Sequence, residues 1–263
     1  MPRVRLDVLL QNRGLARSRA EAQAMLLAGE VELPSAGTRN LRPGSMVAAD
    51  VQLNVRTRPR WASRAAEKLL AALDAFAVDV QGQVVLDAGA STGGFTDVLL
   101  DRGAARVYAV DVGRGQLAER LARDLRVVSM ERTNLRTLDA LPEMAHLATL
   151  DLSFISLRLV LPAVRRLLAP HGQVIALVKP QFEAGKAAVP RGGVIRDPDV
   201  HTGVLERFAA DAAQAGFSVA GLLRSPIAGG DGNVEFLAHL TDPPGITPEA
   251  LTERIRVVAA PSG

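Results

Sequence analysis

The sequence of 263 residues contains no cysteine. This absence excludes disulfide bonds, cysteine nucleophiles and thiolate metal sites, and it fits a reducing compartment. Aromatic residues make up only 3% of the chain, which argues against a recognition surface built from stacked aromatic rings. No apolar run reaches the length of a membrane span, and the N-terminus carries no apolar signal segment. We therefore expect a cytoplasmic protein with no membrane partner.

Lysine is also scarce: three of the 31 basic side chains are lysines, and the other 28 are arginines. Arginine stays protonated at any working pH, whereas a buried lysine can lose its proton and act as a base. Lys179 closes the apolar run of residues 174–178, and Lys68 lies on an amphipathic helix before the main domain. A lysine that ends a buried strand needs a reason to be there, so we expect a chemical role for Lys179. Lys186 lies in a polar loop, where we expect no such role.

The positive charge is concentrated near the N-terminus. Residues 1–60 contain ten arginines and five acidic residues, a net charge of +5; the whole chain carries +3, which leaves −2 for the remainder. A small basic module joined to a near-neutral body is typical of an enzyme with an attachment that grips a polyanion. The alternative is an arginine-rich surface that is simply solvated.

Local patterns in this basic segment predict a small α+β domain. Ser18 and Glu21 match a capping box, which opens a helix, and Gly14 and Gly29 are natural helix ends. We expect one helix beginning near residue 5 and a second beginning at Ser18, each ending at one of these glycines. Strands are expected at 30–33 and 45–48.

This segment resembles the S4 domain, the small RNA-binding module of ribosomal and RNA-modifying proteins. The resemblance is carried by residues 5–7, 13–19 and 28–31, while residues 34–38 replace the turn that is usual in the family. Basic charge alone does not separate RNA from DNA, and the S4 resemblance favours RNA. It implies that the N-terminal domain, residues 1–60 with its linker, contacts RNA phosphates through four arginines: Arg5, Arg13, Arg17 and Arg19.

From residue 82 onward, apolar strand-like runs alternate with helical segments, which predicts a Rossmann-like, parallel, doubly wound α/β sheet. The strands are expected at 84–87, 107–111, 147–151, 174–179, 217–220 and 234–239. Ligands bind such sheets at the C-terminal ends of the strands. Four polar residues lie at such ends and are expected to converge on one crevice: Asp87, Asp111, Asp151 and Lys179. We expect this domain to span residues 61–245, followed by a helix or tail at 246–263.

The first strand leads into a glycine-rich turn within residues 87–97. Its glycines let the backbone approach a ligand closely, and Asp111 ends the next strand at the spacing of a ribose hydroxyl acceptor. The turn lacks the G-x-G-x-x-G pattern of a dinucleotide fold. It resembles instead the S-adenosylmethionine (SAM) loop of methyltransferases, where a glycine turn takes the amino-acid part of the cofactor. The resemblance implies SAM contacts from Asp87, Gly89, Ser91, Thr92, Gly93, Gly94, Phe95 and Asp111.

The same turn also matches a competing motif. Residues 89–93 spell G-x-S-x-G, the nucleophile elbow of serine hydrolases, in a strand–turn–helix context. In that fold the elbow follows several strands, whereas this match falls on the first strand of the sheet. A hydrolase would also need a histidine base late in the chain, for which His201 and His239 are the candidates. No two histidines have zinc-ligand spacing, so we expect no metal.

Four residues complete the pattern of the large domain: Lys68, Asp151, Lys179 and Glu235. Their order resembles the Lys-Asp-Lys-Glu tetrad of the FtsJ-like RNA ribose 2′-O-methyltransferases. Supporting segments are 63–64, 87–97, 111–113, 151–157 and 178–183. With the S4-like module, the chain resembles the TlyA family, often labelled hemolysins, over residues 3–240. One departure is Ala65-Ala66, where the family has two glycines.

The TlyA resemblance implies SAM-dependent 2′-O-methylation of a cytidine ribose in ribosomal RNA. Ribosomal subunits would then be the partners, and the oligomeric state stays open. A non-catalytic RNA-binding or ribosome assembly factor would keep the same fold and bind SAM without methyl transfer. A membrane-active role is suggested by the hemolysin label, but no amphipathic or spanning segment supports it.

The chemistry of the tetrad follows from its substrate. A ribose 2′-hydroxyl is a very weak acid, so it needs a base as it attacks a methyl group. Lys179 is the candidate, because positive charge from Lys68 and partial desolvation favour its neutral amine. Asp151 and Glu235 would orient the lysines and the ribose, although their charges oppose that proton loss; structural salt bridges are their alternative role. The loop of residues 181–197 is either a lid over the RNA or an ordinary crossover loop.

Overall fold

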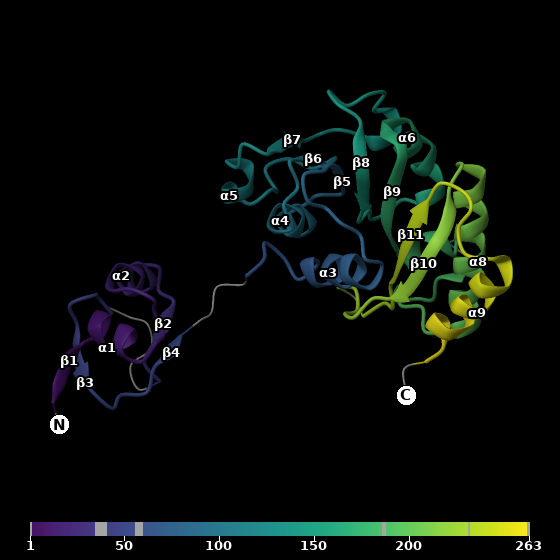
Figure 1. Ribbon diagram of the computed structural model, residues 1–263. Helices are drawn as coiled ribbons and strands as arrows, with labels where there is room; N and C mark the ends of the chain where they lie inside the picture. The colour runs from purple at the N-terminus through teal and green to yellow at the C-terminus, as the bar shows by residue number, and fades with distance from the viewer. Residues whose placement is uncertain (1, 35–40, 56–59, 186–187, 231, 262–263) are drawn as a thin grey trace. The chain divides into compact units, whose positions relative to one another are not determined.

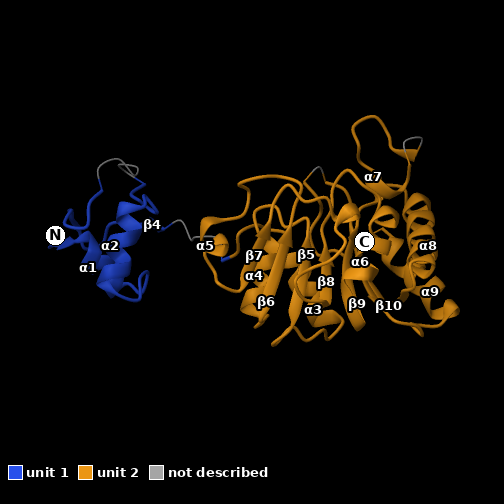
Figure 2. Ribbon diagram, turned by 90° about the horizontal axis from the view of Figure 1, so that it is seen from above, with its two compact units in different colours: residues 1–60 blue, residues 61–263 orange. Residues whose placement is uncertain are grey.

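The computed structural model describes residues 2–34, 41–55, 60–185, 188–230 and 232–261. Lys186 and most of the turn at 34–38 therefore lie outside the described residues. The chain divides into two compact units, Met1–Arg60 and Trp61–Gly263 (Figure 2). Each unit has its own hydrophobic core.

The N-terminal unit is a small α+β structure with two short antiparallel strand pairs. Its elements are β1 (Arg3–Arg5), α1 (Leu6–Asn12), α2 (Arg19–Leu27), β2 (Val31–Glu32), β3 (Met46–Ala48) and β4 (Asn54–Val55). Strand β1 pairs with β3, and β2 pairs with β4. The capping box is confirmed, since Ser18 Oγ accepts a hydrogen bond from the Glu21 N–H at 3.1 Å. Strands β1 and β4 were not predicted, because segments of two or three residues carry no periodic signal.

The larger unit is built on one seven-stranded sheet. Its strands are β5 (Val84–Ala88), β6 (Arg106–Val110), β7 (Val127–Met130), β8 (Ala145–Leu150), β9 (Leu168–Val178), β10 (Ser218–Arg224) and β11 (Phe236–Thr241). They lie in the order β10-β11-β9-β8-β5-β6-β7 (Figure 1). Strands β5 to β9 are mutually parallel, but β11 runs antiparallel to β9 and β10 runs antiparallel to β11. The predicted α/β class is confirmed; the sheet is mostly parallel, and β10 and β11 make it mixed.

Two further features of the sheet differ from the prediction: one strand was missed, and another begins later than expected. Strand β7 was missed, because its only apolar signal is the short run Val127–Met130. Strand β11 begins at Phe236, so Glu235 precedes the strand and does not belong to it. The pairing of β11 with β9 and β10 therefore begins directly after Glu235, a member of the tetrad.

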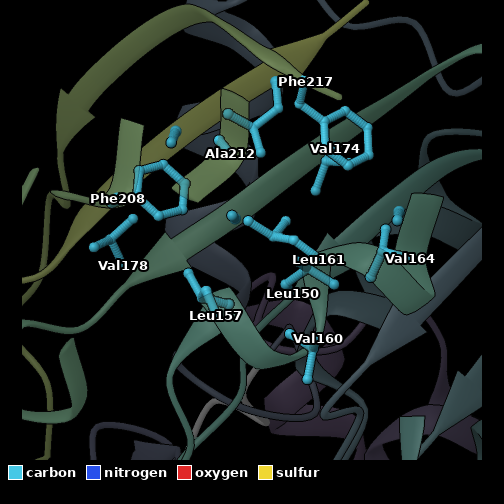
Figure 3. Packing of buried hydrophobic residues seen from close by; sticks show 14 of the residues in the cluster. Leu150, Leu157, Val160, Leu161, Val164, Val174, Val178, Phe208, Ala212 and Phe217 are labelled. Atoms are coloured by element: carbon cyan, nitrogen blue, oxygen red, sulfur yellow. The ribbon is translucent and has the colours of Figure 1, made fainter. Parts of the chain in front are cut away.

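Successive side chains of the strands point to opposite faces of the sheet and pack into two hydrophobic cores, one on each face. One face is covered by α3 (Ala66–Ala75), α4 (Gly94–Asp101) and α5 (Glu119–Ala122). The other is covered by α6 (Leu161–Leu167), α8 (Pro198–Gln214) and α9 (Pro248–Ala259), and Figure 3 shows its apolar side chains. The region expected as a helix or tail at 246–263 contains α9, which packs against α8 and β10. The remaining short helices are α7 (Pro180–Glu183) and 3-10 turns at Leu135–Thr137 and Leu157–Leu159.

Candidate active site

The turn from β5 into α4 brings the backbone close to the end of β8. Gly89 has a φ of +84°, and a Cβ atom at this position would clash with the carbonyl oxygen of Asp151. Both facts require glycine here. Ser91, with a φ of +47°, donates its N–H to Asp111 Oδ2 at 2.9 Å, and Gly113 donates its N–H to Asp111 Oδ1 at 2.7 Å. Two backbone donors thus fix the Asp111 carboxylate beside the turn.

A cavity of about 460 Å³ opens at this edge of the sheet. Its volume lies within the range of cofactor sites, roughly 300–1,000 Å³. The predicted residues Gly89, Ser91 and Asp111 line it on one side. Residues 151–155, which follow β8, also line it. The wall therefore joins a candidate cofactor site to one member of the tetrad.

Asp87 is not among the residues that line this cavity. Its side chain is fully buried and accepts hydrogen bonds from Thr96 Oγ1 at 2.6 Å and Thr149 Oγ1 at 3.0 Å. Burial raises the pKa of Asp87 to about 6. The carboxyl group ties β5 to α4 and β8, so it shapes the glycine turn from behind.

The other residues of the turn also lie outside the cavity. A Cβ at Gly93 would clash with Leu117 and Leu121, and a Cβ at Gly94 would clash with Ser63. Three positions of the turn therefore serve packing or backbone bonding: Gly93 and Gly94, as above, and Thr92, whose carbonyl accepts the Ala118 N–H at 3.1 Å. Phe95 belongs to the hydrophobic core.

The four tetrad residues form two ion pairs. Lys179 Nζ lies 2.7 Å from Asp151 Oδ1 and 3.0 Å from Ser153 Oγ. Lys68, on α3, forms the second pair with Glu235. Three of the four are buried, with exposed fractions of 7% for Lys68, 8% for Lys179 and 3% for Glu235.

Strand register brings these two pairs together. Phe236 of β11 lies opposite Val178 of β9, so one further step of the antiparallel register places Glu235 opposite Lys179. Asp151 directly follows β8, the parallel neighbour of β9 on the other side. The sheet thus gathers residues far apart in sequence at one edge, where Asp151 borders the cavity.

An exposed aromatic ring at the site was missed from the sequence. Phe154 is 91% exposed, lines the cavity and has a φ of +64°. Its ring lies 5.2 Å from that of Phe182 at an interplanar angle of 49°, and Phe182 lies 5.9 Å from Lys179 Nζ. A non-glycine residue at positive φ is uncommon, and such residues cluster at functional sites. Composition alone gives no signal for a single exposed ring of this kind.

Glu183 holds the loop that carries Phe154. Its carboxylate accepts hydrogen bonds from Ser156 Oγ at 2.6 Å and from the Leu157 N–H at 2.8 Å. Burial raises the pKa of Glu183 above its ordinary value. Because Glu183 lies on the short helix that follows Lys179, the lysine and the loop are joined through it.

The four arginines expected to contact RNA differ in the partners that their side chains have within the N-terminal unit. Arg5 and Arg19 form ion pairs with the fully buried carboxylate of Asp7, and these contacts hold its pKa well below its usual range. Arg13 donates to the carbonyl oxygens of residues 49 and 51, each at 2.6 Å. The side chain of Arg17 is exposed and has no hydrogen-bond or ion-pair partner within the described residues. Three of these arginines therefore also serve the structure of their own unit.

The hydrolase alternative lacks its base. His201 Nε2 bonds to the carbonyl of Ile195 at 3.2 Å, and His239 Nε2 bonds to Gln173 Oε1 at 2.7 Å. Burial lowers the pKa of both imidazoles. Within the described residues, neither histidine meets Ser91, so no nucleophile–base pair forms there.

The described part of the chain offers neither a metal site nor a membrane helix. It contains no group of three or more histidine, aspartate or glutamate side chains placed to hold a metal ion. None of its helices is long and apolar enough to cross a membrane.

Known proteins show clear similarity to this chain. The model of the FtsJ-like methyltransferases matches residues 61–241. The 16S/23S rRNA (cytidine-2'-O)-methyltransferase TlyA of Mycobacterium tuberculosis is 47% identical over 242 residues, which cover 90% of each chain. Hemolysin A of Brachyspira hyodysenteriae is 37% identical over 239 residues, covering 90% of this chain and 99% of that protein.

Solved structures agree with these similarities. A Streptococcus thermophilus protein with the provisional name of a hemolysin matches with a TM-score of 0.73 at 43% identity, covering 98% of this chain and 96% of that one. An S-adenosylmethionine-dependent methyltransferase from Mesorhizobium loti matches with a TM-score of 0.51 at 17% identity, covering 68% of this chain and 99% of that one. The second match shows the fold alone.

Proposed function

Because the chain belongs to the TlyA-type members of the FtsJ-like methyltransferase family, we propose that it transfers a methyl group from SAM to the 2′-hydroxyl of a cytidine ribose in ribosomal RNA. One observation carries the proposal: Lys179 is held by Asp151 and Ser153, and these two partners line a cavity of cofactor size. The ribosomal substrate and the cytidine come from the names of the relatives.

The residues around the cavity fit SAM. Asp111 presents a carboxylate fixed by two backbone donors, which suits the hydroxyls of a ribose. Gly89 lets the turn pack against the backbone of Asp151 at the cavity, where the turn would meet the amino-acid part of the cofactor. Val112, which is 73% exposed, and the buried Leu135 give apolar surface for a purine ring. When bound, SAM would supply an electrophilic methyl group.

Lys179 is the proposed base for the ribose hydroxyl. In its neutral form, Nζ would take the 2′-hydroxyl proton as the ribose oxygen bonds to the methyl carbon, while the bond between that carbon and the cofactor sulfur breaks to leave S-adenosylhomocysteine. Asp151 and Ser153 hold Nζ at the cavity wall, and Asp151 stabilises the ammonium that results. Glu235, which lies opposite Lys179 in the strand register, pairs with Lys68 on α3, and this second charged pair would orient the ribose.

Phe154 is proposed as a platform for the base of the target nucleotide. The exposed ring lies at the cavity wall and is braced by Phe182, beside Lys179. Stacking on an aromatic ring is the common way to hold an unstacked base, and it contributes about 1–3 kcal/mol per base. A base resting on Phe154 would bring its own ribose toward Lys179.

The N-terminal unit is proposed to be an S4-like RNA-binding module. Its exposed arginines, with Arg17 free of partners in the described residues, supply phosphate contacts. Removal of residues 1–60 is then expected to weaken RNA binding and its salt dependence, because several arginine–phosphate contacts are lost.

Methylation of isolated ribosomal subunits by the purified protein tests the function directly. Subunits from cells without this gene would be incubated with labelled SAM, and 2′-O-methylated nucleotides would be mapped in both RNAs. A new 2′-O-methylcytidine supports the proposal. SAM and RNA binding without any methyl transfer would instead favour the non-catalytic assembly factor.

A further inference from the structure

Asn233 is a buried polar residue two positions before Glu235. It is 1% exposed and all of its side-chain polar atoms are bonded. Its Nδ2 donates to the Gly193 carbonyl at 2.9 Å, and its Oδ1 accepts the Ile195 N–H at 3.0 Å. Its own carbonyl accepts the Gly229 N–H at 2.9 Å. One residue thus closes the backbone bonds of two separate loops.

The two loops border different parts of the tetrad. The first, residues 188–197, belongs to the polar segment that starts just after Lys179. The second, residues 225–235 without the undescribed residue 231, connects β10 to β11 and ends at Glu235. We call them the α7–α8 loop and the β10–β11 loop. Asn233 is the side-chain link between them.

Ile195 of the α7–α8 loop is held from both sides of Glu235. Its N–H bonds to Asn233, while its carbonyl bonds to His201 Nε2 at 3.2 Å. The His201 ring packs edge-on against Phe236, with centroids 5.4 Å apart. The α7–α8 loop is therefore bound to Asn233 directly and to Phe236 through His201, and these two residues flank Glu235 in the sequence.

The β10–β11 loop closes directly onto that carboxylate. A Cβ atom at Gly229 would lie 2.5 Å from Glu235 Oε1, whereas Glu235 Oε2 pairs with Lys68. The loop backbone at Gly229 is in turn set by its bond to Asn233. A shift of Asn233 would therefore move the surroundings of Glu235 without touching the cofactor cavity, which Asn233 does not line.

We infer that Asn233 is a positioning residue for Glu235, which locks the α7–α8 and β10–β11 loops into one unit around the Lys68–Glu235 pair. The catalytic consequence rests on the proposed methyl transfer, but the locking of the loops does not. The α7–α8 loop, the second half of the polar segment 181–197, would then help to hold the tetrad in place.

Two measurements on the full-length Asn233→Ala variant test the inference. Hydrogen exchange of the α7–α8 loop should rise, although the substitution lies in the β10–β11 loop, because the Ile195 and Gly193 partners are lost. The kcat for methylation of ribosomal subunits should fall on the order of 10-fold, since the buried Ile195 N–H and the part-buried Gly193 carbonyl are left unpaired. SAM affinity should stay at the wild-type value.

Asn233→Asp gives a signature that a stability role would not produce. A protonated aspartic acid can still donate to the Gly193 carbonyl, whereas an aspartate repels it. The ratio of variant to wild-type kcat should therefore fall as pH rises. The other titratable and charged groups nearby are present in both proteins and so are common to the two sides of this ratio: Lys68, Asp197, His201, Arg224 and Glu235.

Two neighbouring glycines provide a matched pair. Gly229→Ala should lower kcat through its contact with Glu235, whereas Gly230→Ala should be silent, because a Cβ atom there would have no atom within 4 Å and neither glycine has a positive φ. Equal activities of these two variants would overturn the inference.

The inference also fails if Asn233→Ala leaves the α7–α8 loop protected, or if its activity falls only in proportion to the fraction of folded, SAM-binding protein. Absence of methyl transfer in the wild-type protein would sink the proposed function instead. Hydrogen exchange would then still decide whether Asn233 locks the two loops.

Discussion

Lys179 Nζ lies 2.7 Å from Asp151 Oδ1, and the two residues directly follow neighbouring parallel strands, β9 and β8. Asp151 also lines the cavity, so the same carboxylate holds the proposed base and borders the proposed cofactor. The position of Nζ is therefore set by the sheet itself, with Ser153 as its second partner. A substitution at Lys179 can change the chemistry while the sheet that positions it stays intact.

Lys179→Arg is expected to abolish methyl transfer while SAM affinity and the melting temperature stay close to wild type. Arginine keeps the positive charge beside Asp151, but it does not give up its proton near neutral pH. Single-turnover methylation of ribosomal RNA is the measurement. The control is Lys186→Arg, at the lysine outside the described residues, which should be nearly silent. Near wild-type turnover in Lys179→Arg would mean that the proton leaves by another route.

Strand ends of a parallel sheet share one edge, and this explains why Asp151 and Lys179 could be placed together from the sequence. Lys68, on a helix, and Glu235, before an antiparallel strand, joined them only through the resemblance to the FtsJ-like family. The hydrogen bonds of Asp87 to Thr96 and Thr149 were not predicted, because they depend on the packing of β5 against α4 and β8. The sequence also failed to predict that Arg5 and Arg19 meet Asp7, since that cluster depends on tertiary packing of two helices. Phe154 is exposed and has a positive φ, and no local sequence pattern predicts either property.

Gly89→Ala should destroy SAM binding, and Gly216→Ala should not. The two glycines have nearly equal φ values, +84° and +83°, so alanine costs similar backbone strain at each, about 1 kcal/mol. Only at Gly89 would the new Cβ meet another backbone, the carbonyl of Asp151. Calorimetric titration with SAM, beside the melting temperature of each variant, separates strain from contact. Equal SAM affinities would remove the glycine turn from the cofactor site.

Phe154→Ala should lower kcat/KM for ribosomal RNA by roughly 10- to 100-fold, the value of one stacked base. The melting temperature should hardly change, because the ring is 91% exposed. Leu125→Ala, at a side chain that is 96% exposed and outside the cavity, is the control. If both variants methylated RNA equally well, Phe154 would have no part in holding the base.

Asp87→Asn should remove a specific pH dependence of stability. The folded pKa of Asp87, about 6, lies above its ordinary value, so its contribution to stability is full below about pH 4 and is lost as pH rises through 6. That loss amounts to about 3 kcal/mol. The free energy of unfolding of the variant, relative to wild type, should therefore increase between pH 4 and 7. Urea unfolding at several pH values measures it.

The control for that titration is Asp139→Asn, because Asp139 is exposed and its substitution should give a curve parallel to wild type. Histidines and other groups titrate in all three proteins and cancel in the differences. A parallel curve for Asp87→Asn as well would show that this carboxyl group does not bind a proton in the folded state near pH 6.

Arg17→Ala should weaken RNA binding without lowering the stability of the N-terminal unit. Its side chain has no partner in the described residues, so its removal deletes at most a phosphate contact and reduces the salt slope of binding by about one. Arg13→Ala should differ, because the carbonyl oxygens of residues 49 and 51 would lose their donors and the unit would lose stability. Filter binding to ribosomal RNA over a range of salt concentrations, together with thermal unfolding, measures both effects. Arg207→Ala, at an exposed position on α8, controls for the loss of one charge alone. If the salt slopes of Arg17→Ala and Arg207→Ala were the same, Arg17 would make no phosphate contact of its own, and recognition by this unit would depend on the arginines that Asp7 holds in place.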